Sequence, residues 1–227
     1  MKIITATLSI ICLLATFSAN GANFNLDTGY AASASKYDKT LINEVDIAGS
    51  RIIGVGIHGV IIYSDDQGKN WQQSNVPTTK TLTAIDCLND NLCWAVGHDA
   101  FILKTTDGGE NWNIQYSDEI FDAPLLSISM FNNRMGIAVG AFAKSLRTND
   151  GGATWEEFFV TEDEFQPHLN NVLTNGMNAY VAGELGLFYH SSDQGQNWTT
   201  YETGYNGSLW SSLLIKDDQL ILIGMSG

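Results

Sequence analysis

The stretch Thr105-Thr-Asp107-Gly-Gly109-Glu-Asn-Trp112 follows a pattern, Ser/Thr-x-Asp-x-Gly-x-x-Trp, that occurs four times in the 227-residue chain. The other three copies are Ser64-Asp-Asp66-Gln-Gly68-Lys-Asn-Trp71, Thr148-Asn-Asp150-Gly-Gly152-Ala-Thr-Trp155 and Ser191-Ser-Asp193-Gln-Gly195-Gln-Asn-Trp198. Successive motif aspartates are 41, 43 and 43 residues apart. A period of about 40 to 45 residues, filled with short apolar segments, is typical of the blades of a β-propeller.

A second periodic element precedes each motif. It ends in a glycine ten residues before the motif aspartate, at Gly56, Gly97, Gly140 and Gly183, and it recurs at Leu222-Ile-Gly224. Short apolar segments lie on either side of this element and read as strands. We therefore expect an all-β propeller in which each repeat is a blade of four antiparallel strands, with the motif in the turn between the third and fourth strands.

The motif residues have properties that suit a tight turn. Asp and Ser/Thr side chains bond to main-chain groups within turns, glycine adopts conformations that a Cβ penalises, and tryptophan covers the turn with a large apolar surface. We therefore interpret the four repeated aspartates as structural, and not as catalytic acids; they are Asp66, Asp107, Asp150 and Asp193.

The motif, together with the Ala-Val-Gly strand before it, resembles the BNR or Asp-box propellers, and most closely the photosystem II stability and assembly factor family. The segments from Trp94 to Gly97 and from Ile102 to Trp112 carry the likeness most fully. The resemblance implies a seven-bladed propeller and a non-enzymatic role in binding proteins or assembling membrane protein complexes. Those factors are associated with a basic patch, whereas this chain has only three arginines, Arg51, Arg134 and Arg147, spread along the sequence.

The repeats divide the chain into units with approximate bounds 41–76, 77–118, 119–162, 163–204 and 205–227. The ten-residue rule places the aspartate of the fifth motif beyond Gly227. We expect four complete blades and a truncated fifth, as in a fragment of a larger propeller, with closure of the arc by dimerisation as the alternative. Residues 22–40 contain no repeat element and are expected to form an exposed lead-in.

The N-terminal residues 1–21 have the features of a secretory signal peptide. Lys2 is followed by an uncharged apolar run from Ile3 to Phe17, and small residues such as Gly21 follow. We expect an exported protein, periplasmic or secreted, with an uncleaved N-terminal anchor as the alternative. No later stretch of the sequence is long and apolar enough to cross a membrane as a helix.

Acidic side chains dominate the charge of the chain. It has 25 Asp and Glu residues against 11 Lys and Arg, and loss of Lys2 with the signal peptide leaves a formal charge of −15. Such a surface repels phosphate backbones, so nucleic-acid binding is not expected. The same charge can attract cations or basic partners.

Two cysteines remain after removal of the signal peptide, Cys87 and Cys93, and they flank a short segment that reads as a hairpin turn. Residues opposite each other across a hairpin come within disulfide range, and an exported chain meets an oxidising compartment. We expect a Cys87–Cys93 disulfide, with free thiols as the alternative. No metal site or cofactor is expected, because no His or further Cys completes a set of ligands and no phosphate-binding motif is present.

The connections between the second and third strands and those between blades are expected to share one face of the propeller, opposite the Asp motifs. Acids and aromatic residues in these loops form the candidate surface for a protein partner in the cell envelope. Its members are His58, His98, Asp118, Glu119, Phe121, Asp122, Glu162, Asp163, Glu164, Phe165 and Glu184. The alternative is an acidic rim that contacts only solvent.

The Asp motif is shared with glycoside hydrolases, whose chemistry needs two carboxylates across a cleft. The acids in the loops between blades keep such an enzyme as the alternative function. A sialidase is not expected, because its substrate carboxylate needs three converging arginines, and the arginines here fall near turns at blade edges. We predict a non-enzymatic, exported propeller that serves as a protein-binding or assembly scaffold.

Overall fold

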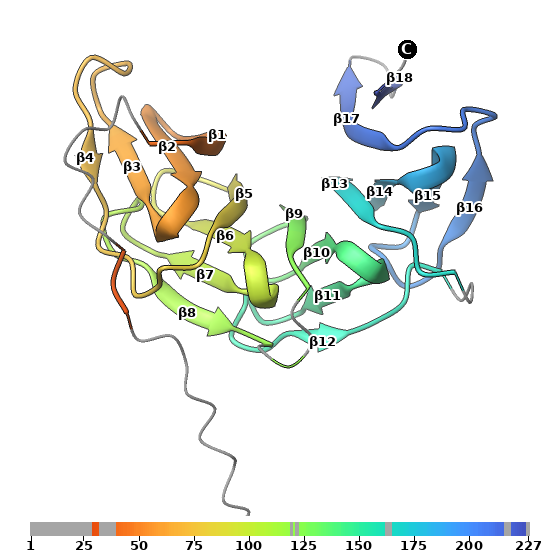
Figure 1. The fold of residues 1–227 in the computed structure, drawn as a ribbon, viewed down its shortest axis with the longest axis horizontal. Helices are drawn as coiled ribbons and strands as arrows, with labels where there is room; N and C mark the ends of the chain where they lie inside the picture. Colours follow the sequence, from red (N-terminus) through yellow and green to blue (C-terminus); the bar gives the residue numbers. More distant parts are fainter. Residues whose placement is uncertain are drawn as a thin grey trace, which may run out of the picture.

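The computed structural model describes residues 29–31, 40–118, 120, 123–161, 165–215 and 219–225. Within these ranges the strands form five antiparallel sheets that follow one another along an open arc (Figure 1). This arrangement confirms the expected all-β propeller architecture, and we number the sheets as blades 1 to 5 in chain order. The predicted signal peptide, residues 1–21, lies outside the described residues.

Blades 1 to 4 have four strands each, and blade 5 has two among the described residues. Blade 1 holds β1 (Ile42–Ala48), β2 (Arg51–Gly56), β3 (Ile61–Ser64) and β4 (Gln72–Gln73), and blade 2 holds β5 (Leu82–Cys87), β6 (Cys93–Gly97), β7 (Ile102–Thr105) and β8 (Asn113–Tyr116). Blade 3 holds β9 (Leu125–Met130), β10 (Gly136–Gly140), β11 (Ser145–Thr148) and β12 (Glu156–Glu157). Blade 4 holds β13 (Leu169–Asn175), β14 (Asn178–Gly183), β15 (Leu187–Ser191) and β16 (Thr199–Glu202), and blade 5 holds β17 (Leu209–Ile215) and β18 (Gln219–Gly224).

The strands of each blade pair in chain order, so every blade is a simple antiparallel meander. The first strand of each blade lies on the inner side of the arc and contacts the first strand of the next blade, while β4, β8, β12 and β16 lie on the outer side (Figure 1). Four short 3-10 turns connect the second and third strands of blades 1 to 4. They are η2 (Ile57–Gly59), η3 (His98–Ala100), η4 (Ala141–Ala143) and η5 (Glu184–Gly186).

The core lies between neighbouring blades. Val55 and Ile61 of blade 1 are fully buried in one cluster with Leu82, Phe101 and Leu103 of blade 2. Burial of such side chains contributes roughly 1.5 to 3 kcal/mol each. Where no described residue covers the face of a blade, apolar side chains stay exposed; examples are Val45 and Ile47 in β1 and Leu213, Ile221 and Ile223 in β17 and β18.

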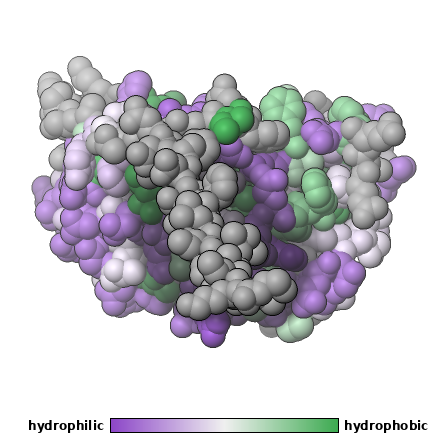
Figure 2. Space-filling model, turned by 90° about the horizontal axis from the view of Figure 1, so that it is seen from below, coloured by the Kyte–Doolittle hydropathy of each residue, from purple (hydrophilic) through white to green (hydrophobic). Residues whose placement is uncertain are grey.

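The surface away from these faces is mainly polar. Seen from the side of β8 and β12, hydrophilic residues cover most of the visible described surface, and apolar residues form smaller patches (Figure 2). The helical segments of blades 1 to 4 are three-residue turns, and no helix in the described ranges could span a bilayer.

Side chains link the inner strands of neighbouring blades. The inner strand is an edge of its sheet, so its outward N–H groups need partners from elsewhere. A carboxylate or hydroxyl on one blade accepts a hydrogen bond from the main-chain N–H of the next. The links run from Cys87 to Asp46 (2.6 Å), from Met130 to Asp86 (2.8 Å) and from Thr174 to Ser129 (3.1 Å).

A second row of such links lies beside the first. Glu44 accepts from the N–H of Ile85 (2.7 Å), Ser127 from Val172 (3.1 Å) and Asn171 from Ser212 (3.0 Å). The two rows join the blades through directional bonds in addition to apolar packing, so they help to fix the register of each blade against the next.

Candidate functional site

The Asp motif of blade 2 shows how a repeat can close its outer hairpin. Thr105 Oγ1 donates to Asp107 Oδ1 (2.8 Å) and accepts from the N–H of Gly109 (3.0 Å). Asp107 also accepts from the main-chain N–H (3.0 Å) and the side-chain amide (2.9 Å) of Asn111. Trp112 Nε1 donates to the carbonyl of Gly109 (3.1 Å). Each polar group of the motif therefore has a partner inside the turn.

The other three motif aspartates have the same partners at the same spacing. Asp66 accepts from Asn70, Asp150 from Thr154 and Asp193 from Asn197, in each case from both main chain and side chain. These bonds favour the ionised form and lower the pKa of Asp150 and of Asp193 to about 2. The four carboxylates lie in the turns of separate blades, so they form no catalytic pair, and their geometry is that of turn-building groups.

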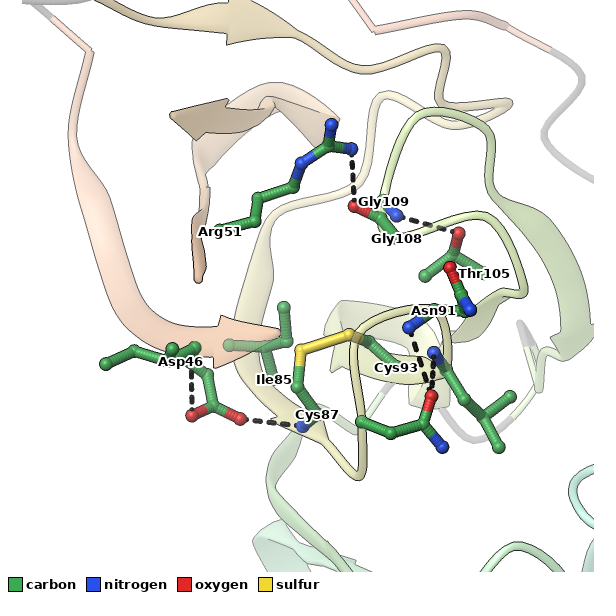
Figure 3. The surroundings of a disulfide bond; sticks show 12 residues. Asp46, Arg51, Ile85, Cys87, Asn91, Cys93, Thr105, Gly108 and Gly109 are labelled. Atoms are coloured by element: carbon green, nitrogen blue, oxygen red, sulfur yellow. Dashed lines mark hydrogen bonds between the residues drawn. A yellow bond between two sulfur atoms is a disulfide. The ribbon is translucent and has the colours of Figure 1, made fainter. Parts of the chain in front are cut away.

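A disulfide bond joins Cys87 and Cys93 at the end of the β5–β6 hairpin (Figure 3). The main-chain N–H of Cys87 also donates to Asp46 of blade 1, so the bridge lies directly beside an inter-blade link. On the same side of the molecule, Arg51 of blade 1 donates to the carbonyl of Gly108 in the motif of blade 2 (3.0 Å). This region is therefore a structural junction between blades 1 and 2.

The three arginines have separate partners. Arg51 forms an ion pair with Asp65 (2.7 Å), Arg134 donates to the carbonyl of Asn149 (3.4 Å), and the guanidinium of Arg147 lies 5.7 Å from the ring centre of Phe158. They do not converge on one point, so the arrangement that a sialidase needs for its substrate carboxylate is not present.

The opposite face carries the four 3-10 turns and the connections between blades, and we call it the loop face. Main-chain bonds tie the turns to those connections. Ala100 donates to the carbonyl of Ala123 (2.9 Å), Ala143 to Pro167 (2.9 Å) and Gly186 to Gly207 (2.7 Å). The two sets of loops therefore share one face, as expected from the strand order.

The central residue of each 3-10 turn has a left-handed backbone conformation. The residues are His58, Asp99, Phe142 and Leu185, with φ of 55°, 57°, 54° and 56°. Side chains other than glycine rarely adopt this region, and Phe and Leu do so least readily. The four residues share this conformation although their side chains differ in size and polarity, so the surrounding structure imposes the backbone geometry. Each blade therefore presents a different side chain at the same position.

Phe142 is the centre of an aromatic cluster between blades 3 and 4. Its ring lies 4.9 Å from that of His168, and its N–H donates to His168 Nδ1 (3.3 Å). Glu184 accepts from the N–H of His168 (2.9 Å). Phe142 is 52% exposed and Leu185, beside Glu184, is 58% exposed. We call Phe142, His168, Glu184 and Leu185 the Phe142 cluster.

Several charged side chains of the loop face form ion pairs. Lys80 pairs with Asp99 (2.5 Å), and the buried Lys144 pairs with Asp118 (2.9 Å) and with Glu157. Burial alone would lower the pKa of Lys144, but the hydrogen bonds that its ammonium group donates to Glu157 and Asp118 raise the pKa above its ordinary value. These carboxylates are therefore engaged with a cation and are not available as a free acid and base.

The structure places five of the predicted binding residues on the loop face, but in different roles. His58 and His98 are exposed, Phe165 is 57% exposed, Asp118 belongs to the Lys144 ion pairs, and Glu184 belongs to the Phe142 cluster. The other six, Glu119, Phe121, Asp122, Glu162, Asp163 and Glu164, lie outside the described residues. No group of three or more His, Cys, Asp or Glu side chains within the described ranges could hold a metal ion.

The surface predicted from the sequence did not include Phe142, His168 or Leu185. The sequence does contain a signal for the central residues of the four 3-10 turns. Each of them lies two residues after a periodic glycine, so Gly183 marks Leu185 in the way that Gly140 marks Phe142.

Residues 64–134 and 119–205 match the family model described as Photosynthesis system II assembly factor YCF48, and together the two matches cover more than half of the chain. A stretch of 76 residues is 34% identical to the uncharacterized protein YkuO of Bacillus subtilis (strain 168), over 34% of this chain and 25% of that protein.

Among solved structures, the fold is similar to YCF48 bound to D1 peptide, with a TM-score of 0.62 and 18% identity over 82% of this chain and 62% of that one. It is also similar to an ancestral GH74 enzyme (TM-score 0.58, 15% identity, 70% of this chain and 24% of that one) and to YCF48 from Cyanidioschyzon merolae (TM-score 0.52, 14% identity, 85% of this chain and 82% of that one). At these identities the likeness shows the fold. The chain thus spans a quarter of YkuO and less than two thirds of the peptide-bound YCF48.

Proposed function

The chain belongs to the YCF48 photosynthesis system II assembly factor family, and from this premise we propose that it is an exported, non-enzymatic scaffold that binds a segment of a partner protein while a complex is assembled in the cell envelope. A YCF48 propeller of similar fold has been solved with a D1 peptide. That precedent supports a peptide segment as the kind of ligand, and we assign its binding to the loop face.

The observation that carries this proposal is the row of four equivalent left-handed turns. Each turn holds its central residue in the same backbone conformation, and the side chains of His58, Phe142 and Leu185 are exposed there. Residues in rare backbone conformations persist where their surroundings determine them, and they often mark binding sites. A side chain that is already held in place loses little freedom when it binds a partner.

The Phe142 cluster supplies the anchor of this surface. Exposed aromatic side chains supply most of the binding energy at many protein interfaces. Phe142 is held against His168, and the carboxylate of Glu184 lies next to Leu185. An apolar side chain of the partner, followed by a basic one, matches this arrangement.

No observation favours the hydrolase that the sequence left as the alternative. The fold similarity to the GH74 enzyme carries no information about chemistry at 15% identity. The described acids of the loop face, Asp99, Asp118 and Glu184, are engaged with a lysine or a main-chain N–H. A glycosidase needs one such acid free to donate a proton and another free to attack or activate water.

Site-specific photo-cross-linking tests the proposal. We would place p-benzoylphenylalanine at Phe142 in one variant and at Lys69, an exposed position in the motif turn of blade 1, in the control. We expect the first variant to form a cross-link with one envelope protein, mapped by mass spectrometry to a single segment, and the control to form none. Equal yields of the same products from both positions would show that the loop face is not the binding surface.

A further inference from the structure

A groove of about 580 Å³ opens on the outer side of the arc, between blades 3 and 4. Phe159 and Val160, which follow β12, form one wall, and Gln196 and Trp198 of the blade 4 motif with Thr200 and Glu202 of β16 form the other. Phe159 is 71% exposed although it is a phenylalanine. Phe159 and Val160 belong to the connection between blades 3 and 4, but none of the lining residues belongs to the Phe142 cluster, so binding in the groove is tested separately from the function proposed above.

The corresponding place between blades 1 and 2 is filled. Val76 and Val160 each lie five residues after the tryptophan of their motif, so they occupy equivalent positions. Ala31, from the lead-in before blade 1, donates its N–H to the carbonyl of Val76 (3.0 Å) and packs against the core of blades 1 and 2. A segment remote in sequence therefore binds at this place through its main chain.

The residue before each of these valines also differs: it is Asn75 between blades 1 and 2 and Phe159 between blades 3 and 4. Asn75 donates its N–H to the carbonyl of Glu110 (2.9 Å) and accepts from the N–H of Trp112 (3.0 Å), which closes the junction between blades 1 and 2. Phe159 stands at the place of Asn75. Among the described residues it forms no main-chain hydrogen bond to Gln196 or Trp198, the counterparts of Glu110 and of Trp112.

The groove thus combines a main-chain position that no described residue fills with the side chains of Phe159 and Trp198 and one carboxylate, that of Glu202. Trp198 stacks on Phe158, with ring centres 6.3 Å apart, and its indole N–H is already bonded to Gly195. The carboxylate of Glu202 lines the opening, in a chain whose formal charge is −14. Main-chain groups at a groove recognise an extended peptide, and the pockets beside them select its side chains.

We propose that this groove binds an extended peptide segment of a partner protein. Its small residue pairs with the carbonyl of Val160, as Ala31 pairs with Val76. A lysine or arginine of the segment lies beside Glu202 and against the ring of Phe159, where charge attraction and cation–π contact both favour a cation. The site would give the protein a second contact with a partner, on a different side from the Phe142 cluster.

Fluorescence anisotropy with the full chain tests this site. The probe is a fluorescein-labelled octapeptide in which alanine alternates with lysine, and the matched peptide has glutamate in place of lysine. We expect the lysine peptide to bind with a dissociation constant below about 1 mM and the glutamate peptide to bind at least about tenfold more weakly. Phe159→Ala and Glu202→Gln should each weaken binding at least about fivefold.

Phe142→Ala is the matched control, because it removes an exposed phenylalanine from the loop face and should leave peptide binding unchanged. Thr200→Trp, on the exposed strand β16, should fill the groove and block binding in a chain whose folding is checked by its melting temperature. No binding of the lysine peptide, equal binding of the glutamate peptide, or full binding by both Phe159→Ala and Thr200→Trp would overturn the proposal. Loss of binding in Phe142→Ala alone would assign the peptide to the loop face instead.

Discussion

Asp86 on the inner strand β5 makes folding stability depend on pH. Its carboxylate is half-buried between β1 and β9 and accepts one hydrogen bond from the N–H of Met130 (2.8 Å). Burial, and then the neighbouring carboxylates Asp46 and Glu44 on β1, raise the pKa of Asp86 to about 7, although the bond from Met130 acts in the opposite direction. The substitution Asp86→Asn keeps an oxygen acceptor for Met130 and removes the charge.

The size of the effect follows from this shift. A change in pKa from 3.8 to about 7 corresponds to ~4 kcal/mol at 1.36 kcal/mol per unit. Asp86 keeps some contact with solvent, which screens the charge, so we take about half of this, ~2 kcal/mol. Because the folded-state pKa is raised, the contribution is fully present below pH 3.8 and is lost as the pH rises to about 7.

Urea unfolding followed by tryptophan fluorescence at about pH 4 and about pH 8 measures this difference. We expect Asp86→Asn to be more stable than the wild type by ~2 kcal/mol at the higher pH and to differ little at the lower pH. Ser129→Ala is the control, because it removes the equivalent acceptor on blade 3 without a titrating group and should cost ~1 kcal/mol at both pH values. The same pH dependence in Asp86→Asn and wild type would refute the reasoning.

Three further predictions concern the scaffold. Asp150→Ala removes the acceptor for both Thr154 bonds and should lower the free energy of unfolding, whereas Glu156→Ala, at an exposed strand position, should change it by less than ~0.5 kcal/mol in the same urea titration. Reduction of the Cys87–Cys93 disulfide should cost ~2–3 kcal/mol, read as a lower melting temperature in reductant, and a Cys87→Ala/Cys93→Ala chain should show no response to reductant. At Leu185, where φ is 56°, glycine should be more stable than alanine by ~1 kcal/mol in thermal melts, and a less stable glycine variant would contradict the left-handed conformation.

The fold could be predicted because its signals are local. The turn motif and its period set the hairpins, and the strands follow at fixed distances from them. The third strand of blade 3 was the weakest in the sequence, since Ala143 to Leu146 contains a lysine and a serine. The strand β11 nevertheless forms, two residues further along at Ser145–Thr148, where β10 pairs with it, whereas Ala143 belongs to the turn η4.

The candidate sites depend on backbone conformation and on contacts between blades, which cannot be predicted from amino-acid composition. At the centres of the 3-10 turns, the shared property is a left-handed backbone conformation. His58 and Leu185 both adopt it, but they differ in residue type, so a pattern of residue type at these positions could not detect them. At the groove between blades 3 and 4, Phe159 does not make with the described residues the main-chain bonds that Asn75 makes at the other junction. Such a difference becomes visible only when equivalent positions of two blades are compared in three dimensions.

Under the function proposed above, the two faces of the propeller divide stability and recognition between them. On the motif side, the side chains of Thr105, Asp107 and Trp112 bond within their own turn, so a change there removes bonds that no other group supplies. On the loop face, the turns are fixed by main-chain bonds such as that from Ala143 to Pro167, and these do not involve the displayed side chain. The same turn therefore tolerates histidine, aspartate, phenylalanine and leucine at its centre. It follows that substitutions at Phe142 should alter binding while the melting temperature stays close to that of the wild type, whereas substitutions in the motifs should do the reverse.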